Sequence, residues 1–438
     1  MSRADFAVPR PPHPFVYLVL ILPFGISGGY VTVALAYQLT RGGVDAVQVA
    51  AIAAMELFPQ TWKFLWAPVS DTTLTRKRWY LIGVALTAIG MLACGLVPSD
   101  AASLPVLSAL VFLMSVATTF VAMSVEALIA HHTPEGIKGR ASGWFQAGNL
   151  GGAGLGGGTG LWMAQHLSAP WISAAVLGLA CLLCGLALLP ISEPARARSR
   201  DPAAGRGHAF PPALVHQWSN LLLVLKDLWV LVRSRRGFLA LLVVFLPITT
   251  GAASNLWAAV ADGWNASANT VALVNGTLGG AASAAGCFVG GYFCDRISRK
   301  SAYLLYGAAQ ALCAVAMALA PHSESMYAAF TLVYAVLNGM GYAAFSAVAL
   351  ETIGAKAAAT EYNVFASLSN MPILYMGLAE GWAYTRFGAS AMLYTEAALA
   401  AVAIVVFAGA SAVTARPGSG DRSRGTQPER PLQQGGEP

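Results

Sequence analysis

The chain has 438 residues, of which 56% are hydrophobic and only 11% are charged. Soluble domains carry about 25% charged residues, so this composition argues against a water-soluble enzyme. The formal net charge of +6 would by itself be compatible with nucleic-acid binding. The basic residues, however, gather in segments that membrane topology explains. We therefore predict an all-α membrane protein that has no nucleic-acid partner.

Twelve segments are apolar and long enough to cross the bilayer as helices, which takes about 20 residues each. The first, 15–39, is too long for the apolar core of a signal peptide and is predicted to be a retained span. In chain order the predicted transmembrane helices are 15–39, 46–69, 79–97, 104–129, 142–165, 170–190, 238–260, 269–293, 301–320, 326–350, 362–385 and 390–413.

The segments outside these spans are polar. A basic linker, 191–237, separates the first six spans from the last six. Its part 213–233 has leucines at helical spacing, which predicts an amphipathic helix on the membrane surface. The N-terminal tail is 1–14, and the C-terminal tail, 414–438, is rich in Pro, Gly and Gln and is predicted to be disordered. The predicted halves are therefore 15–190 and 238–413.

The 26 Lys and Arg residues are distributed unevenly between the two sides of the membrane. With both termini inside, 23 of them fall in inner segments and only Arg41 and Arg386 fall outside, while Lys63 lies within a span. Inner loops carry the excess of Lys and Arg in membrane proteins. The distribution thus predicts an even number of spans with both termini cytoplasmic.

Acidic residues recur at matching places in the two halves. Asp71 follows the second span and Glu126 comes 55 residues later, whereas Asp295 follows the eighth span and Glu351 comes 56 residues later. Two pseudo-symmetric six-helix halves joined by a basic linker resemble the layout of the major facilitator superfamily. The resemblance implies a substrate path between the halves, with access that alternates as they rock.

Residues 291–300 read G-Y-F-C-D-R-I-S-R-K, which is similar to the G-x-x-x-D-R-x-G-R-K signature of that superfamily with a Ser in place of a Gly. An acid at a helix end can pair with an Arg or with a helix N-terminus and hold one conformation of a gate. The first half lacks the leading Gly and the adjacent Arg, and the alternative is that the basic charge serves topology alone. The predicted gate residues are Asp71, Asp295, Arg296, Arg299 and Lys300.

Further stretches narrow the resemblance. K-F-L-W-A-P-V-S-D at 63–71 and V-N-G-T-L-G at 274–279 are similar to the AmpG-like permeases, as are T-E-Y at 360–362, A-S-L-S at 366–369 and G-W at 381–382. That branch also includes acetyl-CoA transporters and siderophore permeases. The resemblance implies uptake across a bacterial inner membrane, usually coupled to protons, of anhydromuropeptides in the namesake proteins. Those proteins often have two more spans, and the shorter siderophore permeases fit this length better.

Ionisable residues within spans are costly, so they are candidates for function. Glu56 and Lys63 share one face of the second span, too far apart for direct contact, with Gln60 between them. We expect Glu56 to accept a proton and Lys63 to bind an anionic substrate group. The alternative for Lys63 is that its side chain reaches the inner surface.

Four further acids lie in or near spans. Glu126 and Glu351 are predicted either as proton-coupling residues or as cytoplasmic gate partners of Arg140 or Arg296. Glu380 lies close to the outer boundary, which leaves solvent exposure and a functional role both open. Glu396 is in the twelfth span, which is usually peripheral in the superfamily that this chain resembles.

Neutral polar side chains within spans can line a cavity or pack between helices, because a buried amide needs a hydrogen-bond partner in either case. A sugar or peptide substrate would need several such amides and aromatic faces. Besides Lys63, the predicted substrate-binding residues are Tyr30, Tyr37, Gln146, Asn149, Asn255, Trp257, Asn275, Asn338, Asn370 and Tyr375.

Other motifs favour ordinary structural roles. Residues 152–157 match G-x-G-x-x-G, but they lie within a span, where small residues let helices approach closely, and not after a strand as in a dinucleotide site. Cys181 and Cys184 form C-x-x-C in an apolar span without a second pair, so buried thiols are expected. His131 and His132 lack acids or cysteines at ligand spacing. No metal site and no cofactor is predicted.

These observations predict a monomeric secondary transporter that imports an organic solute, with a small-molecule substrate, protons and the lipid bilayer as its partners. A cell-wall-derived muropeptide, or a similar amphiphilic or anionic compound, is the predicted substrate. A siderophore permease and an exporter of drug-like solutes are alternatives. A membrane sensor that does not transport is the alternative from another class.

Overall fold

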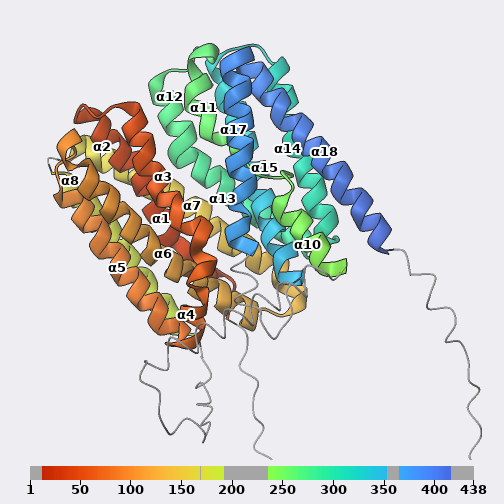
Figure 1. Ribbon diagram of the computed structural model, residues 1–438, viewed down its shortest axis with the longest axis horizontal. Helices are drawn as coiled ribbons and strands as arrows, with labels where there is room; N and C mark the ends of the chain where they lie inside the picture. Colours follow the sequence, from red (N-terminus) through yellow and green to blue (C-terminus); the bar gives the residue numbers. More distant parts are fainter. Residues whose placement is uncertain (1–11, 168, 192–234, 353–364, 416–438) are drawn as a thin grey trace, which may run out of the picture.

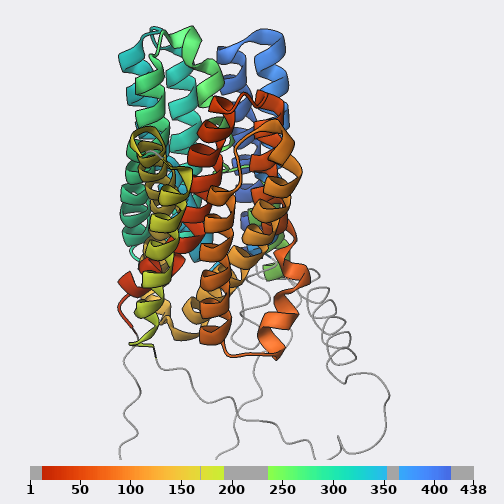
Figure 2. The same ribbon diagram turned by 90° about the vertical axis from the view of Figure 1, so that its left-hand side faces the viewer.

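The computed structural model describes residues 12–167, 169–191, 235–352 and 365–415. Within these ranges the protein consists of helices and their connections, with no strand. The long helices lie side by side in an elongated bundle, which Figures 1 and 2 show from two directions. The predicted amphipathic helix 213–233, most of both predicted tails and the T-E-Y motif at 360–362 lie outside the described residues.

The first part of the chain fills one side of the bundle (Figure 1). Its first helix contains a π-helical turn, η1, and its second predicted span is broken into separate helices. The elements are α1 (Phe15–Gly29), η1 (Tyr30–Leu35), α2 (Ala36–Arg41), α3 (Ala46–Trp62), η2 (Lys63–Leu65), α4 (Ala67–Thr72), α5 (Arg76–Leu96), η3 (Ala101–Ser103), α6 (Leu104–His132), η4 (Glu135–Ile137), α7 (Lys138–His166), α8 (Pro170–Cys184) and η5 (Gly185–Leu188).

The second part fills the other side (Figure 1). Its first predicted span is interrupted after Phe245, where Pro247 precedes a left-handed Gly251 with φ 66°, because proline cannot continue a helix and glycine tolerates positive φ. The elements are α10 (Arg235–Phe245), η6 (Ala252–Leu256), α11 (Trp257–Val260), η7 (Ala261–Trp264), α12 (Ala268–Leu273), η8 (Val274–Leu278), α13 (Gly279–Cys294), α14 (Arg299–Leu319), α15 (Glu324–Thr352), α17 (Asn370–Phe387) and α18 (Ala389–Ala415).

Eight helices among the described residues are long and apolar enough to cross a membrane. The predicted all-α membrane protein is therefore confirmed. The other four predicted spans, 46–69, 142–165, 238–260 and 362–385, also contain helix. They are broken or carry more polar residues and glycines, which lowers their hydropathy. The count of twelve crossings stays a prediction.

Each side of the bundle has its own apolar core. On the first side, Tyr17, Tyr30 and Tyr80 are buried among aliphatic side chains of α1, α5, α6 and α8, and the Tyr80 hydroxyl donates a hydrogen bond to the Leu20 carbonyl over 2.9 Å. On the second side, aromatic rings such as that of Trp264 fill the space between α11, η7, α14, α15 and α18. The first core also includes buried residues of α10, of the end of α15 and of the chain before α17, so apolar packing continues between the two sides.

Helix α7 lies between the two sides and packs closely on both. Its Gly156 lies against α1, where an added Cβ would be 2.1 Å from the Ile26 carbonyl oxygen. Its Gly154 lies against α13, where a Cβ would be 2.7 Å from the Cα of Gly280. The G-x-G-x-x-G match therefore serves helix packing, as the sequence predicts.

Candidate functional site

A buried ion pair joins the broken second span to α6. Lys63 Nζ lies 2.7 Å from Glu126 Oε1, and both side chains are only 5% exposed. The alternative in which Lys63 reaches the inner surface is therefore wrong. Glu126 Oε2 is buried and has no hydrogen-bond partner among the described residues. A charge buried at this depth needs an opposite charge beside it, so each residue of the pair depends on the other.

The K-F-L-W-A-P motif explains how Lys63 comes to face α6. Helix α3 ends at Trp62, and the single turn η2 places Lys63 before α4 begins at Ala67. The indole Nε1 of Trp66 donates a hydrogen bond to Thr119 Oγ1 over 2.9 Å. Because Thr119 and Glu126 are seven residues apart, they lie on one face of α6. The turn is thus held to this face at two points.

Glu56 lies on α3 and is also buried, with 7% of its surface exposed. Its neighbour is an amide, because Gln60 Nε2 donates a hydrogen bond to Glu56 Oε1 over 2.5 Å. The carboxylate faces α1, where a Cβ added to Gly28 would lie 3.4 Å from Oε1. Gln60 is therefore placed beside Glu56 as expected, while Lys63 is bound to a different acid.

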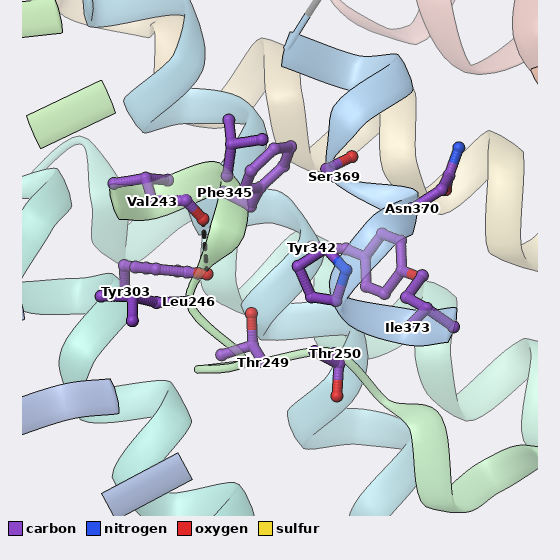
Figure 3. A pocket seen from close by; sticks show the side chains of 12 residues that line it. Val243, Leu246, Thr249, Thr250, Tyr303, Tyr342, Phe345, Ser369, Asn370 and Ile373 are labelled. Carbon is purple, nitrogen blue, oxygen red and sulfur yellow. Dashed lines mark hydrogen bonds between the residues drawn. The ribbon is translucent and has the colours of Figure 1, made fainter. Parts of the chain in front are cut away.

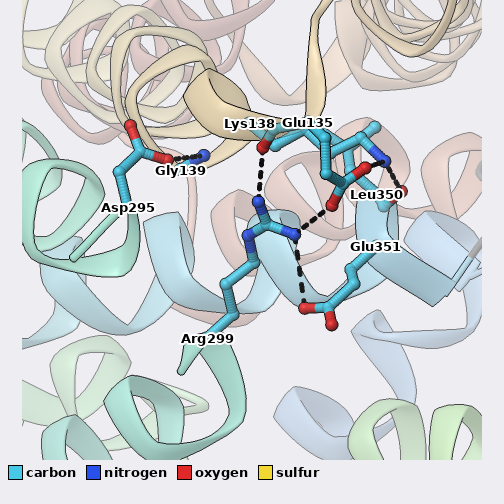
Figure 4. Close-up of polar contacts among 7 residues, drawn as sticks. All are labelled: Glu135, Lys138, Gly139, Asp295, Arg299, Leu350 and Glu351. Atoms are coloured by element: carbon cyan, nitrogen blue, oxygen red, sulfur yellow. Dashed lines mark hydrogen bonds and ion pairs between the residues drawn. The ribbon is translucent and has the colours of Figure 1, made fainter. Parts of the chain in front are cut away.

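A polar network closes one end of the bundle, and we call it the basic-end network. Asp295, at the end of α13, accepts hydrogen bonds from the backbone N–H groups of Gly139 and Arg140 over 2.7 and 3.1 Å. Its side chain also pairs with Arg140 Nε at 2.9 Å. Figure 4 shows Asp295 beside the first turn of α7. A carboxylate at a helix N-terminus is stabilised by the unpaired N–H groups and the helix dipole.

The other part of the basic-end network is centred on Arg299 at the start of α14. Its Nη1 lies 2.6 Å from Glu135 Oε1 and 3.4 Å from Glu351 Oε2, as Figure 4 shows. Lys138 binds Glu135 as well, at 2.7 Å, and donates to the Leu350 carbonyl over 2.9 Å. Hydrogen bonds from Lys138 and Arg299 lower the pKa of Glu135. The basic-end network is therefore Glu135, Lys138, Arg140, Asp295, Arg299 and Glu351.

The network clarifies the predicted partners of the repeated acids. Glu351 contacts Arg299, and Glu126 is paired with Lys63, so neither binds Arg140 or Arg296 as predicted for gate partners. The reason for the difference is that Arg140 of α7 pairs with Asp295 at the end of α13, while the Arg296 guanidinium lies over the Tyr292 ring. Glu135, which joins the loop before α7 to Arg299 of α14, was not predicted. Its position between His132 at the end of α6 and Lys138 at the start of α7 is the sequence feature that could have indicated such a contact.

The remaining predicted gate residues have other surroundings. The guanidinium of Arg296 lies over the ring of Tyr292, 3.8 Å from its centroid, a cation–π contact. Lys300 is half-buried near the start of α14. Asp71 lies in α4, and its side chain is outside what the structure describes. The network thus brings together Asp295 and Arg299 from the predicted gate set.

Polar candidates on α7 connect the two sides of the bundle. Gln146 Nε2 donates a hydrogen bond to Ser346 Oγ of α15 over 2.5 Å. Asn149 Nδ2 donates to Gln146 Oε1 over 3.0 Å. Both amides are therefore satisfied by protein groups in this conformation, and the pair spans the boundary between helices from different halves.

Two other candidates lie at a cavity in the second half. The cavity has a volume of about 50 Å³ and is lined by α10, the chain after it, α14, α15 and α17 (Figure 3). Asn370 lines it, and the Tyr375 hydroxyl donates to the Phe245 carbonyl over 2.6 Å beside it. Its further polar lining was not predicted from the sequence and consists of Thr249, Thr250, Tyr303, Tyr342 and Ser369.

The other polar candidates are dispersed. Tyr30 is fully buried in the first core, where its hydroxyl has no partner among the described residues. The Tyr37 hydroxyl lies 3.5 Å from Arg41 Nη1. Neither residue lines the cavity of Figure 3.

Three candidates of the second part, Trp257, Asn275 and Asn338, lie on or beside α15. Asn275 Nδ2 donates to the Tyr327 hydroxyl over 3.1 Å, and that hydroxyl donates to the Trp257 carbonyl over 3.0 Å. Asn255 is exposed on η6. Asn338 lies against Gly251, where an added Cβ would be 2.3 Å from its Oδ1.

Two acids of the second half are deeply buried although they were not among the predicted site residues. Glu380 is 0% exposed and Glu396 is 3% exposed. Solvent exposure of Glu380 is therefore excluded, although its position near a helix end pointed to it. The reason is that α17 packs against α18 and η6.

The described residues contain no group of three or more His, Cys, Asp or Glu side chains that could hold a metal ion. All six cysteines are free and buried, including Cys181 and Cys184, as expected for the C-x-x-C in an apolar span. The chemistry available in this bundle is thus that of buried carboxyl groups, one buried lysine and neutral polar side chains.

A helical bundle with buried charges between its helices and a charged network at one end has the features of a membrane transporter. The family model of the Major Facilitator Superfamily matches residues 15–377, and the chain belongs to this superfamily. It is therefore a secondary transporter and not an enzyme.

The chain is also similar in sequence to curated permeases. The chain is 25% identical over 427 residues to the anhydromuropeptide permease of Escherichia coli strain K12, a match that covers 93% of this chain and 81% of the relative. This supports the AmpG-like branch. The corresponding permease of E. coli O157:H7 matches to the same extent.

Solved structures share the fold at lower identity. The fucose:proton symporter of E. coli superposes with a TM-score of 0.63 at 15% identity, covering 91% of this chain and 98% of that one. A proton:xylose symporter gives 0.64 at 14% identity, covering 90% and 95%. The human organic anion transporter gives 0.64 at 16%, covering 91% and 100%.

Proposed function

We propose that the protein imports an anionic, amphiphilic solute into the cytoplasm together with protons, and that a cell-wall-derived muropeptide is that solute. It acts as a monomer in a bacterial inner membrane with both termini in the cytoplasm. The similarity to anhydromuropeptide permeases supports the substrate, and the excess of Lys and Arg at one side supports the orientation. In this orientation the basic-end network is cytoplasmic.

The buried pair of Lys63 and Glu126 carries this proposal. A buried ammonium group that is held by a single carboxylate can exchange that partner for an anionic group of a solute. Glu126 would then remain as an unpaired buried anion, which is strongly unfavourable. Taking up one proton removes that charge. One proton is therefore bound for each anionic group that Lys63 accepts.

Glu56, on α3, provides a second place for a proton. It is buried beside Gln60 and has an amide, not a cation, as its hydrogen-bond partner. Such a carboxyl group can be neutral or charged as movement of the two halves changes its access to water. Glu56 thus acts as a proton-coupling residue, next to the pair that recognises the solute.

The basic-end network provides the gate. Its ion pairs join α7 to the end of α13 and the loop before α7 to α14, and Lys138 of α7 donates a hydrogen bond to the Leu350 carbonyl of α15. The halves therefore cannot separate at this end while these contacts persist. Release into the cytoplasm requires these contacts to break as the halves rock. The conformation described here is therefore closed on the proposed cytoplasmic side.

The direct test is uptake of labelled anhydromuropeptide by the purified protein in proteoliposomes, with and without an inside-alkaline pH gradient. Saturable uptake that the gradient stimulates is expected. Glu324→Gln, which changes an exposed carboxyl group remote from Lys63, is the matched control and should transport like the wild type.

Each negative result of the uptake test excludes a different part of the proposal. A folded protein that takes up no muropeptide in either condition excludes this substrate, and ferric siderophores are then the next solutes to test. Binding without saturable, gradient-dependent flux would instead indicate a sensor. Uptake that the gradient does not affect would contradict proton coupling.

A further inference from the structure

A pair of carboxyl groups is buried between four helices of the second half. Glu380 on α17 and Glu396 on α18 are 0% and 3% exposed, and Gln310 on α14 and Tyr334 on α15 are 2% and 1% exposed. The Tyr334 hydroxyl donates a hydrogen bond to Glu396 Oε1. Glu380 and Glu396 are close enough to interact electrostatically, and Gln310 lies near the Tyr334 hydroxyl.

Most polar atoms of this cluster have no partner. Both carboxylate oxygens of Glu380, Oε2 of Glu396 and both amide atoms of Gln310 are buried without a hydrogen bond among the described residues. Buried polar groups are nearly always satisfied, so such a concentration of unpartnered atoms needs an explanation. Two buried acids and a buried amide near the Tyr334 hydroxyl, all with unpartnered atoms, indicate a small bound species at this place.

No positive charge balances the two acids. Neither carboxyl group forms an ion pair within the part of the chain that the structure describes. The cations of α14 are Arg299 and Lys300 at its first turn, about 15 Å along the axis from Gln310. Arg386 of α17 is exposed. The titratable groups that face the acids are Cys313 of α14 and Tyr334 of α15.

We propose that Glu380 and Glu396 form a proton-binding site in the second half of the transporter. Glu380 takes up one proton and becomes a neutral acid, and its O–H donates to the free oxygen of Glu396 or of Gln310. Glu396 keeps the hydrogen bond from Tyr334. Two adjacent carboxylates cannot both stay charged in a buried place without a cation, so sharing a proton is the simplest way to satisfy them.

A proton fits this cluster better than a metal ion. Hard cations such as Na⁺ and Ca²⁺ need several converging oxygen ligands, and the described residues include no group of three acidic, His or Cys side chains. Gln310 offers a cation only its one amide oxygen, whereas it can both donate to a carboxylate through its nitrogen and accept from a protonated carboxyl group through its oxygen. The ligand is therefore a proton held between two acids.

The site differs in place from Glu56 and the Lys63–Glu126 pair. Its acids lie about 10 Å along α17 and α18 from the end of the bundle opposite the basic-end network. It needs neither the proposed substrate nor the proposed direction of transport. Its protonation acts on the packing of α17 and α18 against α14 and α15.

The test is infrared spectroscopy of the full-length purified protein in lipid. The C=O stretch of protonated carboxyl groups is recorded at neutral pH and identified by its shift in D₂O. The double variant Glu380→Gln/Glu396→Gln should lose one component of this band, because the proton has no carrier left. Both single variants are measured as well, since the proton can move to the acid that remains, and they should keep that component.

The matched control is Glu324→Gln, which removes an exposed carboxyl group and should leave the band unchanged. Glu56→Gln marks any separate component that belongs to the first half. A double variant with the same band as the wild type overturns the proposal. A band that decreases when choline is replaced by Na⁺ also overturns it, because the site would then hold a metal ion. Neither outcome bears on muropeptide uptake.

Discussion

Both sides of the bundle bury ionisable side chains, but they balance the charge in different ways. On the first side, Lys63 and Glu126 form a direct ion pair with 5% exposed side chains. On the second side, Glu380 and Glu396 lie together with a tyrosine and a glutamine and without a cation among the described residues. The first arrangement suits exchange of a partner with an anionic solute, whereas the second suits a shared proton.

The comparison also shows what each pair costs the protein. An ion pair is disrupted by the loss of one member, because the other remains as an uncompensated buried charge. Two adjacent acids avoid repulsion by sharing a proton, so replacing the protonated acid by an amide changes the buried charge little. Mutations should therefore lower stability much more on the first side than on the second.

The largest effect is expected for Lys63→Met. It leaves Glu126 buried without its cation, which should lower the free energy of unfolding by about 3–5 kcal/mol and abolish uptake. The double variant Lys63→Met/Glu126→Leu should recover most of that stability and remain inactive. Thermal unfolding in detergent and proteoliposome uptake measure the two properties. A double variant that transports would contradict the role of the pair.

The second side should respond differently. Glu380→Gln replaces the protonated acid of the pair by an amide of similar shape, so the free energy of unfolding should change by less than about 1 kcal/mol. The same thermal unfolding assay compares this variant with Lys63→Met. A loss as large as that of Lys63→Met would show that the two sides do not differ in charge balance.

A smaller effect is expected at the basic-end network. Asp295→Asn weakens the hydrogen bonds to the N–H groups of Gly139 and Arg140. Hydrogen bonds to a charged group contribute about 1.5–3 kcal/mol. The conformation that is closed at this end should therefore become detectably less populated. Spin labels at Gly136→Cys and Ser298→Cys report the separation. An unchanged distance distribution would remove Asp295 from the gate.

The smallest effect is the response of the network to pH. The pKa of Glu135 is lowered by Lys138 and Arg299, so its contribution to closure is present above its ordinary pKa of about 4.3. It is lost as the pH falls through the lowered value. The same label distance should therefore stay constant from about pH 5 to 8. A change within that range would assign pH sensitivity to the gate instead of to the buried acids.

The sequence was sufficient to predict the class of fold. Composition and apolar segments predicted an all-α membrane protein, and the motif at 291–300 predicted the contact of Asp295 at a helix end. These features depend on local patterns, such as span length, basic loops and signature residues. The structure places Asp295 at the N-terminus of α7, which is one of the two partners that the motif allowed.

Partners across helices could not be predicted in the same way. Glu126 was predicted either as a proton-coupling residue or as a gate partner of Arg140 or Arg296, and the turn η2 instead brings Lys63 to it. Glu380 was left open because its place along the helix says nothing about which face its neighbours cover. Rotation and tilt of helices depend on packing, which here follows glycine contacts such as that of Gly154 with Gly280.

The most direct test of coupling at Lys63 and Glu126 is proton movement caused by the solute itself. Anhydromuropeptide is added to proteoliposomes without an imposed gradient, and a pH indicator inside reports acidification. Acidification should occur with wild-type protein and be absent with Lys63→Met/Glu126→Leu. Solute uptake by the wild type without acidification would contradict the exchange of a proton for the anionic group.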